Sequence, residues 1–174
     1  YNTAVGFQAG SDITTGIQNT FIGALVGDTT TTASNNTAVG YNSLGANTTG
    51  PYNTAIGTIA LDANTTGGFN VAIGRSALSA NTTASVNTAV GHAALAANTT
   101  GTENTALGAN ALDANTEGDN NTALGRDALG QNTTADENTG VGANSLFSNT
   151  TGTANTALGF GSLSSNVSAD NNTA

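Results

Sequence analysis

Hydrophobic residues recur along this chain in a fixed relation to glycine. A Val, Ile or Leu stands directly before Gly at Val5, Ile22 and Val39, and this pair returns every 17 residues as far as Leu158. In most of these repeats a second apolar pair, commonly Ala-Leu, follows four and five residues after the first. This spacing is not that of a helix face, and a glycine in every repeat disfavours helix. The aliphatic site is β-branched in seven of ten repeats, which favours a strand.

The same period governs the polar residues. Asn opens every repeat, and ten complete repeats with the consensus NTAVGxxALxxNTTGxx run from residue 2 to residue 171, with a partial repeat at each end. We number the positions of each repeat 1 to 17 from this Asn. No insertion breaks the register, so residues 1–174 are predicted to form one continuous array without a linker.

A repeat of this length predicts an all-β fold. Seventeen residues are too few for two helices, so we expect a parallel β-solenoid, or β-roll, with one coil per repeat. We predict two short strands per coil, at positions 1 to 4 and 7 to 10, and turns at the position-5 Gly and the NTTG segment. A coil traces at most ~56 Å at ~3.3 Å per residue, and ten coils stacked at ~4.8 Å make a rod of roughly 48 Å.

Charged residues are few and confined to certain positions. There are 13, or 7% of the chain, with a formal net charge of -9, and all lie at positions 6, 7, 10, 11, 14, 16 or 17. Because burying an unpaired charge is costly, the charge-free positions are predicted to form the interior, contact surfaces and tight turns. Two Arg are too few for a nucleic-acid partner, and no apolar run is long enough to span a membrane.

Adjacent apolar positions point to a second packing surface. Successive strand residues face opposite sides, yet positions 3 and 4 are both apolar, as are 8 and 9. If Val5 or Leu44 points into the roll, the Ala or Ser beside it points out and forms a charge-free stripe on which another chain can pack. This predicts a homo-oligomer, with a trimer as the first choice. The array begins and ends inside the period, so we also expect continuation of the protein or end-to-end stacking into a filament.

The segments NTAVGYNSLGANTTG and NTALGANALDANTEG resemble a repeat of tail-fibre-type proteins, including bacterial proteins that end in an endosialidase-type intramolecular chaperone. The resemblance covers the whole chain. The NTAVG and NTAIG cores are also similar to the SVAIG-like repeats in the heads of trimeric autotransporter adhesins, although the adhesin repeat is shorter than 17 residues. The resemblance implies a left-handed β-roll assembled as a trimer, in an extracellular, cell-surface or virion location.

Two rows of identical residues are interpreted as structural. Stacked amides at position 1 are predicted to hydrogen-bond from coil to coil as an Asn ladder, in preference to a ligand-binding row. The ladder residues are Asn2, Asn19, Asn36, Asn53, Asn70, Asn87, Asn104, Asn121, Asn138 and Asn155. The position-5 glycines are expected to make a sharp turn rather than a phosphate loop, because no GxGxxG context surrounds them. They are Gly6, Gly23, Gly40, Gly57, Gly74, Gly91, Gly108, Gly125, Gly142 and Gly159.

A second row of Asn, at position 12, forms N-x-[ST] acceptor sequences for glycosylation. One interpretation is a turn in which Asn bonds to its own backbone. The other is glycosylation, on these Asn or on the Thr rows, of a chain exported through a glycosylating compartment. The candidate acceptors are Asn47, Asn64, Asn81, Asn98, Asn132, Asn149 and Asn166. Asn35, Asn120 and Asn171 form further acceptor sequences at the repeat boundary.

Little else in the sequence indicates chemistry. The 11 acidic residues fit neither the EF-hand nor the calcium-binding nonapeptide spacing. His92 is the only His, and no second His, Cys or nucleophile motif accompanies it. We therefore predict no metal, no cofactor and no enzymatic activity. Tyr41, Tyr52, Phe69 and Phe160 are expected to be exposed and to make surface or inter-chain contacts, with glycan stacking as the alternative.

These observations predict a structural extracellular fibre shaft or filament subunit. The alternative is a surface adhesin or phage-type receptor-binding module that recognises glycans, which requires a patch that breaks the repeat. The strongest deviation lies in the first two repeats, with Gly10, Phe21, Gly27 and a TTTT run. Ice binding through the Thr rows is a third possibility, disfavoured because adjacent Thr residues face opposite sides of a strand.

Overall fold

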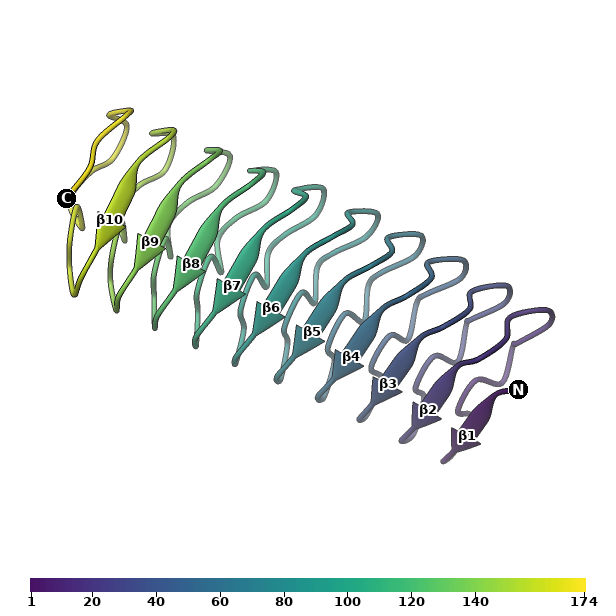
Figure 1. Ribbon diagram of the computed structural model, residues 1–174. Helices are drawn as coiled ribbons and strands as arrows, with labels where there is room; N and C mark the ends of the chain where they lie inside the picture. Colours follow the sequence, from purple (N-terminus) through teal and green to yellow (C-terminus); the bar gives the residue numbers. More distant parts are fainter.

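A computed structural model of the chain describes all 174 residues and contains ten parallel strands and no helix. The strands are hydrogen-bonded in chain order into one sheet, so the chain winds as a parallel β-solenoid whose termini lie at opposite ends of a rod (Figure 1). Each strand pairs with the strand one repeat later, as in Thr37 with Thr54. The strands are β1 (Thr3–Val5), β2 (Thr20–Ile22), β3 (Thr37–Val39), β4 (Thr54–Ile56), β5 (Val71–Ile73), β6 (Thr88–Val90), β7 (Thr105–Leu107), β8 (Thr122–Leu124), β9 (Thr139–Val141) and β10 (Thr156–Leu158).

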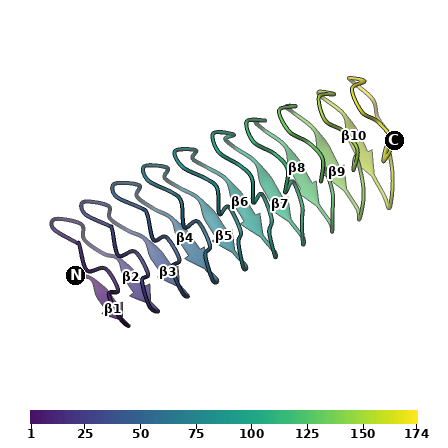
Figure 2. The same cartoon turned by 180° about the vertical axis from the view of Figure 1, so that it is seen from behind.

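Each coil contains one strand, at positions 2 to 4, and the predicted second strand at positions 7 to 10 is wrong. That segment is a run of turns, which can be followed in Figure 2. Its backbone adopts left-handed angles at positions 7 and 9, as at Asn42 (φ 51°) and Leu44 (φ 56°), and these angles are incompatible with an extended strand. The segment still bonds to its neighbours, since Leu44 N–H donates to the Ala60 carbonyl at 3.0 Å.

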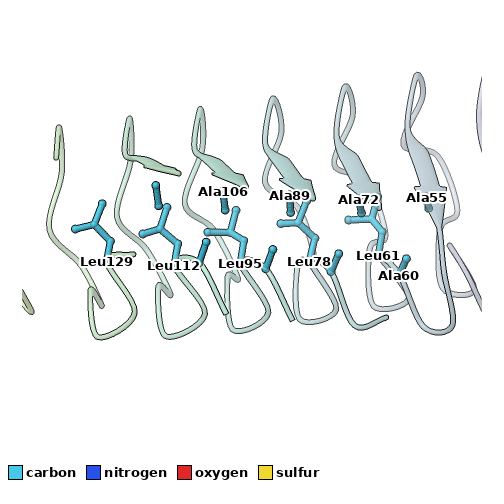
Figure 3. Packing of buried hydrophobic residues seen from close by; sticks show 14 of the residues in the cluster. Ala55, Ala60, Leu61, Ala72, Leu78, Ala89, Leu95, Ala106, Leu112 and Leu129 are labelled. Carbon is cyan, nitrogen blue, oxygen red and sulfur yellow. The ribbon is translucent and has the colours of Figure 1, made fainter. Parts of the chain in front are cut away.

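The interior is filled by the small residue of the strand and the large residue of the turn segment. Ala55 and Ala72, at position 3, are fully buried, whereas Ile56 and Ile73 beside them are 38% and 36% exposed. The prediction that the aliphatic strand residue points inward and the Ala outward is therefore wrong. Leu61 reaches the interior from the opposite segment, and in Figure 3 the position-9 Leu side chains point toward the Ala row.

The thinness of the coil explains this arrangement. Successive strand residues do face opposite sides. Which of them faces inward is determined by the space beside the position-9 Leu, and that space accommodates Ala but not Ile. The predicted outward position of the residue before Leu is also wrong. Ala60 is fully buried together with Leu61, because the left-handed turn directs both side chains inward.

The first two coils use the same interior in a different way. Phe21 replaces Ala at position 3 and is fully buried, and Gly27 replaces Leu at position 9. A Cβ built on Gly27 would lie 2.7 Å from the Phe21 ring, and one built on Gly10 would lie 2.9 Å from it. The large and small residues have thus changed places across the core. The deviation that could have marked a recognition patch is a packing compensation.

Candidate functional site

The position-1 Asn side chains lie inside the rod and connect successive coils. Asn36 Oδ1 accepts the backbone N–H of Asn53 at 2.8 Å, and the same bond recurs from Asn2 to Asn172. The side-chain amide of Asn53 donates to the Gly67 carbonyl at 2.9 Å in its own coil. Most of these amides therefore join two coils through the oxygen and close their own coil through the nitrogen.

The position-12 Asn side chains form a second row of this kind. Asn64 Nδ2 donates to Asn47 Oδ1 at 2.8 Å and to the Gly67 carbonyl at 2.9 Å. The Gly67 carbonyl therefore accepts from Asn53 and Asn64 together, and the corner at position 15 is held from both sides. In the second coil Thr30 stands at position 12, and its buried hydroxyl has no hydrogen-bond partner.

This geometry bears directly on the candidate acceptor Asn residues. Asn47, Asn64, Asn81, Asn98, Asn132 and Asn149 are fully buried, and Asn166 is half-buried near the end of the chain. Asn81, for example, donates to Asn64 Oδ1 at 3.0 Å and to the Ala84 carbonyl at 3.1 Å. A sugar on Nδ2 replaces one of these hydrogens and requires space that the packed interior does not have. Glycosylation of this row stays a prediction, and the packing inside the folded coil disfavours it.

The position-5 glycines occupy a conformation closed to other residues. Gly57 and Gly91 both have φ of 140°. A Cβ on either would lie 2.6 Å from the carbonyl carbon of the position-5 glycine in the next coil. Both the backbone angle and the close approach of neighbouring coils therefore require glycine at this turn.

The outward side of the sheet is the candidate functional surface. It carries position 2, which is Thr in every strand except β5, and position 4, which is always aliphatic; we call these two rows the outer face. No residue at either position is buried, and six aliphatic side chains are 36–71% exposed: Val5, Ile22, Ile56, Ile73, Leu107 and Leu158. No charge interrupts the strip, which measures roughly 48 Å by 7 Å. Solvent-exposed positions without a single charge over ten coils are typical of a contact surface.

Aromatic residues flank the outer face at its two neighbouring turns. Tyr52 and Phe69, at position 17, stack with ring centroids 4.9 Å apart and planes 13° apart. Val86 stands at the same position in the next coil and is also exposed. Tyr41 and Phe160 project from position 6 and are exposed, as the sequence predicted. The aromatic groups thus enlarge the apolar surface beside the outer face.

The titratable groups form a few small contacts and no larger cluster. His92 Nε2 lies 3.2 Å from Arg75 Nη1 on the surface, and Arg126 pairs with Asp127 at 2.9 Å. Burial raises the pKa of Asp62, whose Oδ1 is enclosed without a partner, and burial also raises the pKa of Asp113, with Asp127 adding repulsion. No three His, Cys, Asp or Glu residues lie together as metal ligands. No helix of a length and hydropathy suited to crossing a membrane is present.

Sequence reasoning missed the outer face because it assigned the aliphatic row to the interior. The signal was present in the charges, which avoid positions 2 and 4 although both face outward. No family model, curated protein or solved structure matches the chain. The solenoid and its 17-residue register therefore rest on the chain's own structure, and the likeness to adhesin heads and tail fibres stays a resemblance between repeat sequences.

Proposed function

We propose that this chain is a length of a rigid, non-enzymatic fibre shaft or filament subunit whose copies associate through the outer face, with a trimer as the first choice. The observation that carries the proposal is the uncharged Thr and aliphatic strip running the whole length of the sheet. Exposed aliphatic rows of this extent are unfavourable in water and are stabilised when another surface covers them.

The bonding between coils supports a rigid rod. Coils are joined by backbone hydrogen bonds and by two rows of buried amides, and these contacts recur in nearly every repeat. The position-13 hydroxyls add a further row, as where Thr65 Oγ1 donates to the Thr82 carbonyl at 3.0 Å. A solenoid bonded in the same way at each step has no hinge between domains.

The width of the outer face indicates that its flanking turns take part in the contact between copies. A strip roughly 7 Å wide offers a footprint of about 330 Å², below the roughly 800 Å² per partner of a standard interface. The flanking turns at positions 6 and 17 must then take part, and these carry Tyr41, Tyr52, Phe69 and Phe160. In a trimer around a common axis, each strip faces the axis and its two flanks face two different neighbours.

The non-enzymatic role and the extracellular, cell-surface or virion location belong to the same proposal. His92 has Arg75 as its partner and no carboxylate to orient it as a base. The location rests on the resemblance to adhesin heads and tail fibres. A glycan-recognising adhesin is the second candidate, and a recess lined by Phe147 and Phe160 on the turn segments is the observation that favours it.

The oligomeric state tests the proposal. We expect sedimentation equilibrium to give a particle of three times the 16.9 kDa chain mass. The double variant Ile56→Asp/Ile73→Asp places two charges on the outer face and should yield folded monomers. The matched control Thr66→Asp/Thr83→Asp places two charges in the same coils at the exposed position 14 and should leave the trimer intact. A folded wild-type monomer, or equal behaviour of the two variants, would refute the proposed interface.

A further inference from the structure

One recess on the chain has the size of a small-ligand site. It is an open hollow of about 660 Å³ on the turn segments of three consecutive coils, those that follow β8, β9 and β10. Sites for small molecules commonly fall between roughly 300 and 1,000 Å³ and combine apolar walls with a few polar groups. The recess lies on the turn segments and contains no residue of the outer face.

The recess exists because the repeat is broken at the positions that line it. Phe147 is the only aromatic residue at position 10, and Gly161 is the only glycine at position 7. The Phe147 ring extends over the preceding coil, where a Cβ built on Gly130 would lie 3.1 Å from its Cε2 atom. Phe160 projects from the next coil and is 81% exposed. Two aromatic side chains from adjacent coils therefore line one hollow.

The polar lining is rich in unused hydrogen-bonding groups. The side chains of Asn144, Ser148, Ser164 and Ser165 line the recess and make no hydrogen bond within the chain. By contrast, Ser145 and Ser162, which stand outside the lining, donate to carbonyls of their own coils at 2.9 and 3.0 Å. These four side chains are thus free to form hydrogen bonds with a ligand.

The charges of the recess cancel. Arg126 and Asp127 line one end and pair with each other at 2.9 Å. The pair offers N–H donors and carboxylate acceptors without a net charge, while the chain as a whole carries -9. An anionic ligand is therefore disfavoured, and a neutral ligand with many hydroxyl groups is suited to the lining.

We propose that this recess binds a neutral sugar in pyranose form. A pyranose presents a C–H-rich face, which packs on the phenyl rings of Phe147 and Phe160, and a rim of hydroxyls, which bond to the serines, Asn144 and the Arg126–Asp127 pair. An apolar ligand leaves those polar groups unpaired, and an acidic sugar meets Asp127. The site shares its position-6 residues, Arg126 and Phe160, with a flank of the outer face, and its test is a binding signal that does not use the oligomeric state.

Saturation-transfer NMR tests this assignment with four probes: methyl α-D-glucopyranoside, methyl α-D-mannopyranoside, methyl β-D-galactopyranoside and sialyllactose. We expect transfer to at least one neutral glycoside, with the strongest signal on its ring C–H protons, and weaker transfer to sialyllactose. Phe160→Ala should weaken binding by about three- to tenfold, the loss expected for one aromatic contact. Since Phe160 is largely exposed, this variant folds, and its circular dichroism spectrum should match the wild type.

The matched control is Phe7→Ala. Phe7 occupies the same repeat position as Phe160 and is also strongly exposed, but it lies in the first coil, far from the recess. This variant should bind as the wild type does. Absence of transfer to all three neutral glycosides would overturn the proposal. So would preference for sialyllactose, or equal binding by the Phe160→Ala and Phe7→Ala variants.

Discussion

Asn64 donates one amide hydrogen to Oδ1 of Asn47, 2.8 Å away and one full coil earlier in the chain. Its other amide hydrogen goes to the carbonyl of Gly67 at 2.9 Å. Every hydrogen on this buried nitrogen therefore has an acceptor, and the acceptors belong to two different coils. The row stabilises the stacking of coils and the shape of each corner at the same time, which makes its members sensitive to substitution.

Asn98→Ala is expected to destabilise the rod. Asn98 donates to Asn81 and Gly101 and accepts from Asn115, so its loss leaves buried groups unpaired on both sides. We expect a loss of about 2–4 kcal/mol in the free energy of unfolding, measured by chemical denaturation. The exposed Thr100→Ala in the same coil should change it by less than about 0.5 kcal/mol. Similar losses for the two variants would contradict the role given to the row.

Thr30→Asn is expected to act in the opposite direction. Thr30 stands where the row lacks an Asn, and its buried hydroxyl has no partner. Asn47 uses only one of its two amide hydrogens, in a bond to the Gly50 carbonyl at 3.0 Å. An amide at residue 30 supplies the missing acceptor and extends the row by one coil. We expect a gain of about 1 kcal/mol in the free energy of unfolding, and no gain would show that the row ends there for another reason.

The exchange of large and small residues in the second coil predicts a coupled pair. Phe21→Ala removes a buried ring and should cost about 3–5 kcal/mol. Gly27→Leu alone should also destabilise, because the new side chain overlaps the ring. The double variant Phe21→Ala/Gly27→Leu restores the arrangement of the later coils and should recover much of the loss. Denaturation of all four chains gives the coupling energy, and simple additivity would count against the compensation.

Burial of Asp62 predicts a pH-dependent variant. Burial raises the pKa of this carboxyl above its ordinary value of 3.8, so the folded chain holds the proton more tightly than the unfolded chain. The stability contributed by this group therefore falls as the pH rises from 3.8 through the folded pKa, and the penalty is complete above it. Asp62→Asn should be more stable than the wild type at pH 7 and lose this advantage below pH 3.8. The exposed Glu117→Gln is the control and should show no such gain.

The two classes of acceptor Asn predict where a glycan can be attached. Asn120 and Asn171 are exposed, and their side chains make no hydrogen bond within the chain, whereas the position-12 Asn from Asn47 to Asn149 are buried. After expression in a glycosylating host, peptide mapping should find sugars on Asn120 or Asn171 and none on Asn64 or Asn81. A folded chain with sugar on Asn64 would contradict the geometry of the row. An intact mass equal to the bare sequence would exclude glycosylation altogether.

The 17-residue period predicts most of the fold, because this spacing and the restriction of charges to certain positions exclude most other architectures. Which strand residues point into the interior was not predictable in the same way. Whether Ala55 or Ile56 points inward depends on Leu61, which lies across the coil and enters from a turn. That turn was mistaken for a strand, because Leu44 adopts a positive φ that its residue type does not indicate. The outer face was missed because of the same error. The recess depends on Phe147 lying over Gly130, and this contact between coils is not part of the repeat pattern.

The uniform bonding between coils has a consequence for length. If residues 104–120 were deleted, Asn121 would stand where Asn104 stood, and its N–H would meet the Oδ1 of Asn87 as that of Asn104 does now. The chain can therefore be shortened or extended in whole coils without a change in its cross-section. Each coil adds about 4.8 Å to the rod, so the number of repeats in the sequence determines how far the rod extends.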